Sequence, residues 1–208
     1  MIMIQRILAQ AAAVSLGTAM LFQVGCAGRS KTASFYILSP VAEPQLEMKN
    51  ISVDSTISIG ISPVSLPKYL KKSQIVTRTG SNELHLAEFD RWAGKIEEDI
   101  GRVIAENLAS LLVTDRVFSY PLMEAVALDY TIKMDISRFD GELGGEVELI
   151  VRWVIFDRQE NIVYGVKSTH LTEPARGPDY ADMVATQSRL LASFSRQLAK
   201  AIIELSGS

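Results

Sequence analysis

The chain has 208 residues, with 24 acidic and 21 basic side chains, a formal net charge of −3 and a hydrophobic fraction of 48%. This composition is too apolar for a disordered protein and lacks the basic excess of a nucleic-acid-binding protein, and the length fits one ordinary domain. A single cysteine and two widely separated histidines exclude an internal disulfide and a cysteine-based zinc cluster.

The first 25 residues have the pattern of a secretory signal. One arginine precedes an apolar stretch from Ile7 to Phe22, and the only cysteine, Cys26, follows the small residue Gly25. The stretch is short of the roughly 20 residues that cross a bilayer comfortably. The segment resembles a bacterial lipobox, although Gln23 stands where such sequences prefer leucine. We therefore expect cleavage before Cys26 and acylation of its thiol and of its new amino group.

The alternative for Cys26 is a buried small residue at the end of an uncleaved anchor helix. Because each buried methylene contributes about 0.8 kcal/mol, two or three acyl chains hold a domain on a membrane almost permanently. The expected organisation is a signal peptide at 1–25, a lipidated N-terminus and tether at 26–33, and one domain at 34–208. Ala27 rather than aspartate follows the cysteine, which by resemblance to enterobacterial sorting rules implies the periplasmic face of the outer membrane.

The first half of the domain has short apolar patterns separated by breakers. Residues 41–55 lack periodicity and predict a loop. Residues 56–64 alternate isoleucine with small polar residues, which predicts a half-buried strand. The turn sequence Gly80-Ser81-Asn82 predicts a hairpin between its flanking runs. The four predicted strands are 34–40, 56–64, 74–79 and 83–88.

The second half has two amphipathic helical patterns around a series of strands. Apolar residues from Ile96 to Leu112 recur at helical spacing, and Asp90 is a candidate N-cap. Pro178-Asp179 opens a second helix that runs to about Leu205. The intervening strands are predicted at 116–120, 128–136, 147–156 and 162–171. We therefore predict an α+β fold, a mostly antiparallel sheet with two long amphipathic helices packed on it.

The sequence lacks the motifs of the common enzyme active sites. It has no G-x-S-x-G, H-E-x-x-H, C-x-x-C or Walker sequence. His85 and His170 are interpreted as solvated strand residues. The glycine-rich residues 140–146 are interpreted as a turn, because a strand rather than a helix follows them. We expect no catalytic residue, no metal ligand and no cofactor, apart from covalent acyl chains at Cys26.

Residues 62–78 do not have the pattern of a core element. Two prolines stiffen this stretch and three lysines solvate it. One interpretation is a rigid loop that presents Leu66, Tyr69 and Leu70 to a partner at a low ordering cost. The other is a packed crossover whose lysines reach solvent. The sequence leaves both interpretations open.

Three blocks of the sequence resemble one known family. They read VSLPKYLKKSQIVTR from Val64, NELHLAEFDRWA from Asn82 and IGRVIAENLASLL from Ile100. These blocks resemble the PqiC/YmbA-like family of ABC-type transport auxiliary lipoproteins, and the resemblance covers roughly residues 34–204. The sequence departs from the family at Gly94, where Glu or Pro is more usual.

The resemblance implies an outer-membrane lipoprotein that faces the periplasm and is a non-catalytic accessory of an intermembrane lipid transport system, docked on an MCE-domain protein. Arg78 and Arg91 are then candidates for orienting acidic groups of the partner. Leu66, Tyr69 and Trp92 are the candidate apolar anchors. For Trp92 the alternative is that it packs the first helix onto the sheet.

Two further expectations concern assembly and rival functions. A homo-oligomer fits a lipid route wider than one small domain, and its size is left open by the sequence. The alternative functions are a solitary structural lipoprotein of the cell envelope and, less favoured, a weak periplasmic hydrolase.

Overall fold

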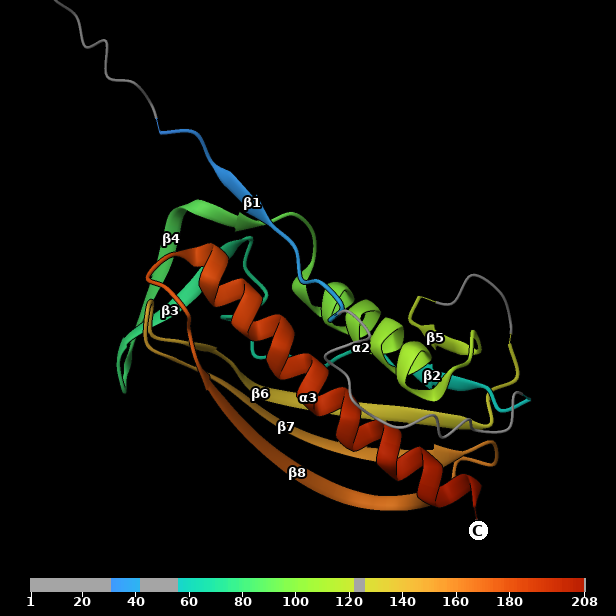
Figure 1. Cartoon of the computed structure of the whole chain (residues 1–208). Helices are drawn as coiled ribbons and strands as arrows, with labels where there is room; N and C mark the ends of the chain where they lie inside the picture. Colours follow the sequence, from blue (N-terminus) through green and yellow to red (C-terminus); the bar gives the residue numbers. More distant parts are fainter. Residues whose placement is uncertain (1–30, 42–55, 122–125, 208) are drawn as a thin grey trace, which may run out of the picture. The chain divides into compact units, whose positions relative to one another are not determined.

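The computed structural model describes residues 31–41, 56–121 and 126–207. The predicted signal peptide, Cys26 and nearly all of the predicted loop at 41–55 lie outside the described residues. The domain has the element order β1-β2-β3-β4-α2-β5-β6-β7-β8-α3 (Figure 1). The predicted α+β class is confirmed, but the strands form two sheets rather than one.

The smaller sheet contains the predicted hairpin and the first strand. It has the order β1-β4-β3 and consists of β1 (Ser34–Tyr36), β4 (Glu83–Trp92) and β3 (Gln74–Gly80). β3 and β4 are antiparallel, whereas β1 runs parallel to β4 with Phe35 opposite Arg91. β1 is therefore an edge strand that pairs on one side only within the described residues.

The larger sheet has the order β5-β2-β6-β7-β8. β6, β7 and β8 form the predicted antiparallel meander, whereas β2 runs parallel to both of its neighbours. β8 ends the sheet, so its outer backbone edge has no partner strand within the described residues. The strands are β5 (Val117–Ser119), β2 (Ile59–Ile61), β6 (Tyr130–Gly141), β7 (Glu146–Asp157) and β8 (Ile162–Pro174).

β2 is shorter and more deeply buried than the half-buried strand predicted at 56–64. All three of its residues are buried, and Ser58 just before it has no exposed surface. A Cβ atom added to Gly60 would clash with the Leu128 side chain, which would have to shift. The small residues of the alternation therefore lie on a second face that is covered rather than solvated.

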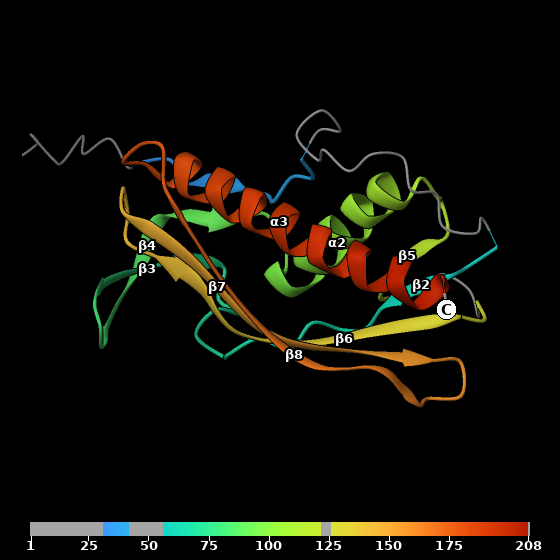
Figure 2. The same ribbon diagram turned by 60° about the horizontal axis from the view of Figure 1, so that its bottom comes forward.

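α2 (Ile96–Leu112) and α3 (Tyr180–Ser206) lie on one face of the larger sheet (Figures 1 and 2). They contact each other, and α3 also contacts β6, β7 and β8. Their apolar stripes and the alternate residues of β6 and β7 form the core. The predicted start of α3 is confirmed, because the Asp179 side chain caps the helix by accepting from the Asp182 amide at 2.9 Å.

The predicted N-cap of α2 is wrong. Asp90 lies within β4, which continues to Trp92, and its carboxylate accepts from the Tyr36 hydroxyl at 2.8 Å. The helix begins after Lys95, which makes no side-chain cap bond. Instead, negatively charged side chains in the first turn interact favourably with the positive end of the helix dipole. They are Glu97, Glu98 and Asp99.

β6 extends beyond Ile136, where its predicted range ends. The pairing of β6 with β7 shifts between Ile136 and Arg138, which marks a bulge. Before the bulge the buried positions are even-numbered, and after it Phe139 enters the core at 2% exposure. The bulge therefore turns Asp140 to the sheet face opposite the helices, because successive strand residues point to opposite faces.

Candidate functional site

The stretch between β2 and β3 is a packed crossover, which decides between the two interpretations left open by the sequence. Val64, Leu66 and Leu70 are only 6–7% exposed. The Ser65 amide donates to the Met134 carbonyl at 3.2 Å, so the crossover continues along β6. Its lysines are exposed, and they are Lys68, Lys71 and Lys72.

Tyr69 and Arg78, two of the predicted partner-binding residues, meet at Asp140. The Asp140 side chain has no exposed surface. Arg78 Nε donates to its Oδ1 at 2.6 Å, and the Tyr69 hydroxyl donates to its Oδ2 at 2.8 Å. Arg138 Nε lies 3.3 Å from Oδ1. These bonds connect the crossover and β3 to β6, and hence the smaller sheet to the larger one.

Two of the donors to Asp140, Tyr69 and Arg78, keep their protons at neutral pH. Burial raises the pKa of the Tyr69 hydroxyl, and its hydrogen bond to Asp140 raises it further. The same carboxylate raises the pKa of the Arg78 guanidinium through a hydrogen bond, against the effect of burial. The arrangement is thus a fixed link between elements.

A polar cavity of about 360 Å³ adjoins this link, beside the β3–β4 and β6–β7 turns. Two of the charges on its wall form an ion pair, since Arg138 Nη1 lies 2.9 Å from Glu148 Oε2. His170 Nε2 lies 3.5 Å from the same oxygen and is exposed. The lining residues are Arg78, Gly80, Ser81, Arg138, Glu142, Glu146 and Glu148. With three glutamates in the wall and a strand after the turn, this cavity does not suit a phosphate.

Trp92 and Arg91 lie next to each other at the end of β4. Trp92 is 7% exposed and belongs to the apolar core, and its amide donates to the Ser73 carbonyl at 2.8 Å. Arg91 is half-buried, with Nη2 3.5 Å from the Glu88 carbonyl oxygen. Leu66 and Trp92 therefore contribute packing in this structure. A partner-binding role for the five predicted residues stays a prediction.

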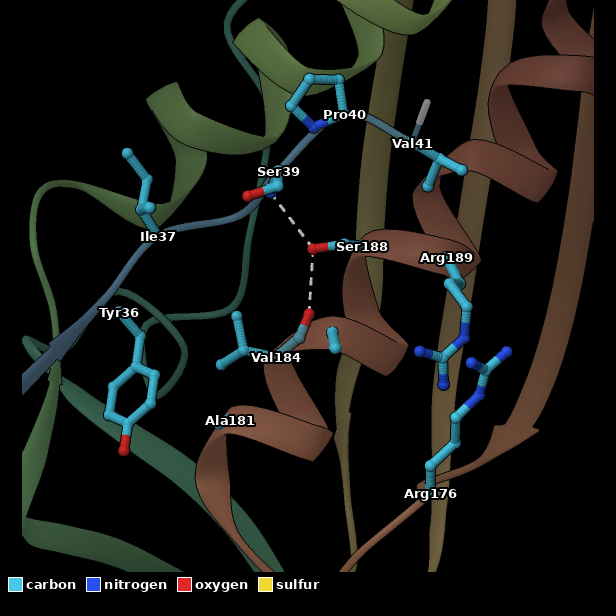
Figure 3. A pocket seen from close by; sticks show the side chains of 11 residues that line it. Tyr36, Ile37, Ser39, Pro40, Val41, Arg176, Ala181, Val184, Ser188 and Arg189 are labelled. Carbon is cyan, nitrogen blue, oxygen red and sulfur yellow. Dashed lines mark hydrogen bonds between the residues drawn. The ribbon is translucent and has the colours of Figure 1, made fainter. Parts of the chain in front are cut away.

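A groove lies between the N-terminal segment 36–41 and α3 (Figure 3). It encloses about 480 Å³, and its lining is mostly apolar. Ile37 lies on one wall, and Val184 lies on the helix wall. Arg176 and Arg189 add two cations to the lining. Arg189 is held by an ion pair with Glu173 and by a hydrogen bond to Thr186.

Side chains of both helices hold the backbone of the segment 36–41. Ser188 Oγ accepts from the Ser39 amide and donates to the Val184 carbonyl at 2.9 Å, as the dashed lines of Figure 3 show. Arg102 Nη2 donates to the Leu38 carbonyl at 2.7 Å. Three backbone amides of the segment donate to helix side chains, from Leu38 to Asp99 at 2.7 Å, from Ser39 to Ser188 at 3.2 Å and from Val41 to Asn107 at 3.1 Å.

The groove and the buried carboxylate were not predicted from the sequence. Asn107 carried a signal, because it is a polar residue on the apolar stripe formed by Ile104, Leu108 and Leu111. A polar residue at such a position needs a hydrogen-bond partner. Asp140 carried no comparable signal, since its place on the sheet face opposite the helices depends on the bulge in β6.

Across residues 31–41, 56–121 and 126–207, no three His, Cys, Asp or Glu side chains are grouped so as to hold a metal ion. In the same residues, no helix combines the length and the hydropathy of a membrane span.

The amino-acid sequence matches a known family over most of its length. The family model described as the ABC-type transport auxiliary lipoprotein component matches residues 36–199. The chain is also similar to the intermembrane transport lipoprotein PqiC of Escherichia coli (strain K12). The two are 24% identical over 142 residues, which cover 66% of this chain and 70% of that protein.

Two solved structures share the fold. The crystal structure of an uncharacterized protein superposes with a TM-score of 0.66 at 20% identity, covering 83% of this chain and 99% of the other. A Xanthomonas campestris protein superposes with a TM-score of 0.66 at 14% identity, covering 84% of this chain and 97% of the other. At these identities the two likenesses concern the fold alone.

Proposed function

Because the chain belongs to the ABC-type transport auxiliary lipoprotein family, we propose that it is a non-catalytic accessory of an intermembrane lipid transport system. The observation that carries this proposal is the extent of the match, which takes in nearly all of the described domain. The similarity to a protein named for intermembrane transport supports the same process. In this proposal energy is supplied by other components.

The proposed function includes a lipid anchor at Cys26, on the periplasmic face of the outer membrane. The apolar stretch that ends at the only cysteine supports this anchor, and Ala27 after it supports the outer membrane. Intact-mass analysis of the membrane-extracted protein tests it. We expect a chain that begins at Cys26 and carries acyl mass, and a water-soluble form of the Cys26→Ser variant. A mature chain without acyl mass would contradict the anchor.

The proposed partner is an MCE-domain protein, and the proposed docking surface is a basic ridge made of Lys68, Lys71 and Lys72. The ridge is exposed, whereas Leu66 and Leu70 beneath it are buried and fix its position. A rigid row of cations suits an acidic patch on a partner, because complementary charge steers association. Buried Leu66 and Trp92 then act by holding the crossover and β4 in place.

Capture of the partner from detergent-extracted membranes tests the ridge. The wild-type protein should recover an MCE-domain protein, and the triple substitution of Lys68, Lys71 and Lys72 by Glu should reduce that recovery about tenfold or more. The matched control makes the same charge change at three exposed lysines elsewhere. They are Lys133, Lys167 and Lys200.

The possible outcomes distinguish a failure of the proposed docking surface from a failure of the proposed accessory function. Equal recovery by the ridge variant and the control would contradict docking at the ridge and leave the accessory function standing. If the wild-type protein recovers no MCE-domain protein, a solitary structural lipoprotein is the better hypothesis. Unchanged unfolding temperatures in both variants are required, and we expect them because all six lysines are exposed.

The non-catalytic character is tested separately with a serine-directed activity probe. His85 and His170 are both exposed on strands, and the carboxylate nearest to His170 is paired with Arg138. We therefore expect no covalent adduct with the folded protein. An adduct at one defined serine would favour the hydrolase hypothesis instead.

A further inference from the structure

Two large apolar side chains are exposed next to each other at the start of the domain. Phe35 in β1 is 66% exposed, and Ile37 just after it is 58% exposed. They are two residues apart, so in extended chain they point to the same side. The residues that alternate with them point inward, since Leu38 is buried and Tyr36 donates to Asp90.

The backbone that presents these side chains is held in place. β1 pairs with β4 along its length, and the Ala93 amide donates to the Tyr36 carbonyl at 2.8 Å. The following residues are bonded to α2 and α3 through Asp99 and Ser188. Phe35 and Ile37 are thus exposed on a fixed edge strand, where apolar exposure indicates a contact surface.

The short tether restricts what this edge can meet. Seven residues separate Cys26 from Ser34. Even a fully extended chain of this length spans only about 28 Å. A membrane that holds acyl chains at Cys26 is therefore always within that distance of β1.

A cation lies across the groove from Ile37. Arg176 lines the groove together with Ile37, and its side chain has no hydrogen bond or ion pair within the described part of the chain. An aromatic and an aliphatic side chain beside an available arginine is the composition of a surface at the water–lipid boundary. The arginine meets lipid phosphates, and the apolar groups enter the acyl region.

We propose that Phe35 and Ile37 contact the membrane in which Cys26 is anchored, with Arg176 at the level of the phosphates. The partner is a phospholipid surface. This inference rests on the proposed lipid anchor, because the tether defines which surface is near. It adds an orientation to that anchor: the β1 edge faces the membrane.

A second exposed apolar pair provides a matched control. Ile162 and Val166 in β8 are 57% and 67% exposed. Tyr164 between them interacts with Glu204, near the C-terminal end of α3. The segment 36–41 instead contacts the N-terminal half of the helix at Ser188. The 27-residue α3 is about 40 Å long, so the two pairs lie near different parts of it.

Photocrosslinking of the full mature protein tests the contact. The acylated chain, purified from membranes, is reconstituted into vesicles of phosphatidylethanolamine and phosphatidylglycerol that contain a lipid with a photoactivatable acyl chain. Peptide mass spectrometry then locates the adducts. We expect them to concentrate in residues 34–41 and to fall about tenfold in the Phe35→Ser/Ile37→Ser variant. The Ile162→Ser/Val166→Ser variant should keep the wild-type yield.

Each possible outcome bears on the proposal. Adducts that are absent from residues 34–41 in an acylated chain, or equally frequent in β8, overturn the orientation and leave the anchor intact. A mature chain that lacks acyl mass overturns the anchor and this inference together. Both double variants replace exposed side chains, so their unfolding temperatures should match that of the wild type.

Discussion

Two irregular segments are fixed on the same domain by different forces. The N-terminal segment 36–41 is held mainly by hydrogen bonds that its backbone amides donate to Asp99, Ser188 and Asn107. The crossover 62–73 is held mainly by burial of the three aliphatic side chains Val64, Leu66 and Leu70. The first mode leaves apolar side chains free to face outward, whereas the second turns them inward and leaves lysines outside.

The difference explains why one segment offers an apolar surface and the other a basic one. Hydrogen bonds satisfy the backbone of the N-terminal segment, and its Leu38 side chain is buried at 1% exposure. Phe35 and Ile37 can therefore remain exposed on a fixed scaffold. The crossover also has backbone bonds, since the Ser62 and Ser65 amides donate to carbonyls of β6. Its three aliphatic side chains are buried in addition, and this burial stabilises it in proportion to the area removed from water.

The largest expected effect is at the crossover. Leu66→Asp places an unpaired carboxylate at a site that is 7% exposed, and we expect a loss on the order of 4 kcal/mol or more in the free energy of unfolding. Urea denaturation measures it. Leu66→Met is the control and should cost less than about 1.5 kcal/mol, since it conserves volume. A folded, stable Leu66→Asp protein would show that the crossover does not depend on burial.

The next largest loss of stability is expected at the ion pair between Arg78 and the buried Asp140. Arg78→Met leaves the fully buried Asp140 with a weaker set of donors, and we expect a loss of about 3 kcal/mol. The control is Arg152→Met, because the Arg152–Asp135 pair is exposed and should contribute less than about 1 kcal/mol. Equal losses in thermal unfolding would mean that burial of the pair is unimportant.

A smaller effect is expected at the N-terminal segment. Ser188→Ala removes the acceptor of the Ser39 amide, which should cost about 1 kcal/mol. Amide hydrogen exchange of residues 34–41 should become faster, while exchange in the crossover should not change. Ser206→Ala, in the last turn of the same helix, is the control. Unchanged exchange at Ser39 would mean that another force holds this segment.

The smallest expected effect is a pH dependence of stability at Asp129, whose carboxylate accepts hydrogen bonds from Ser58 just before β2. Hydrogen bonds from the Ser58 backbone and hydroxyl lower the pKa of Asp129, and Arg158 lowers it further. The ionised form is therefore favoured in the folded state. The resulting stability is present above the unfolded pKa of about 3.9 and is lost as the pH falls through the lower folded pKa.

The contribution of Asp129 is tested by measuring the free energy of unfolding as the pH is lowered. Asp129→Asn should show a shallower loss of stability than the wild type below about pH 4. The pKa values of Asp135 and Asp157 are also lowered, so both proteins should retain some acid dependence. Asp157→Asn, at an exposed turn, is the matched comparison. If the stability of Asp129→Asn and of the wild type falls identically with pH, Asp129 does not contribute to the acid dependence of stability.

Local periodicity made much of the fold predictable. The helices Ile96–Leu112 and Tyr180–Ser206 and the meander of β6, β7 and β8 follow from spacing within short windows. The bulge after Ile136 was not predictable, because the alternation stops there while the strand continues. The Asp90 cap failed for a related reason: nothing local showed that β4 runs on to Trp92.

The candidate site was less predictable than the fold. Prolines and lysines around Leu66 fit both a presented loop and a packed crossover, and only distant residues decide between them. The partner of Arg78 lies 62 positions along the chain. The groove depends on a segment and a helix that are separated by about 150 positions, as the Ser39–Ser188 bond shows. Such contacts have no local signature in a single sequence.

The outer edge of β8, which has no partner strand within the described residues, has a consequence for contacts between neighbouring copies of the protein. Its 13 residues end the larger sheet, and Ile162, Val163 and Val166 are exposed along it. An edge of this kind can accept a strand from another molecule. In the proposed membrane-anchored form, neighbouring copies meet more often than copies dispersed in solution. Edge lysines and irregular pairing oppose strand addition, and β8 has both, in Lys167 and in the register shifts near Ile155.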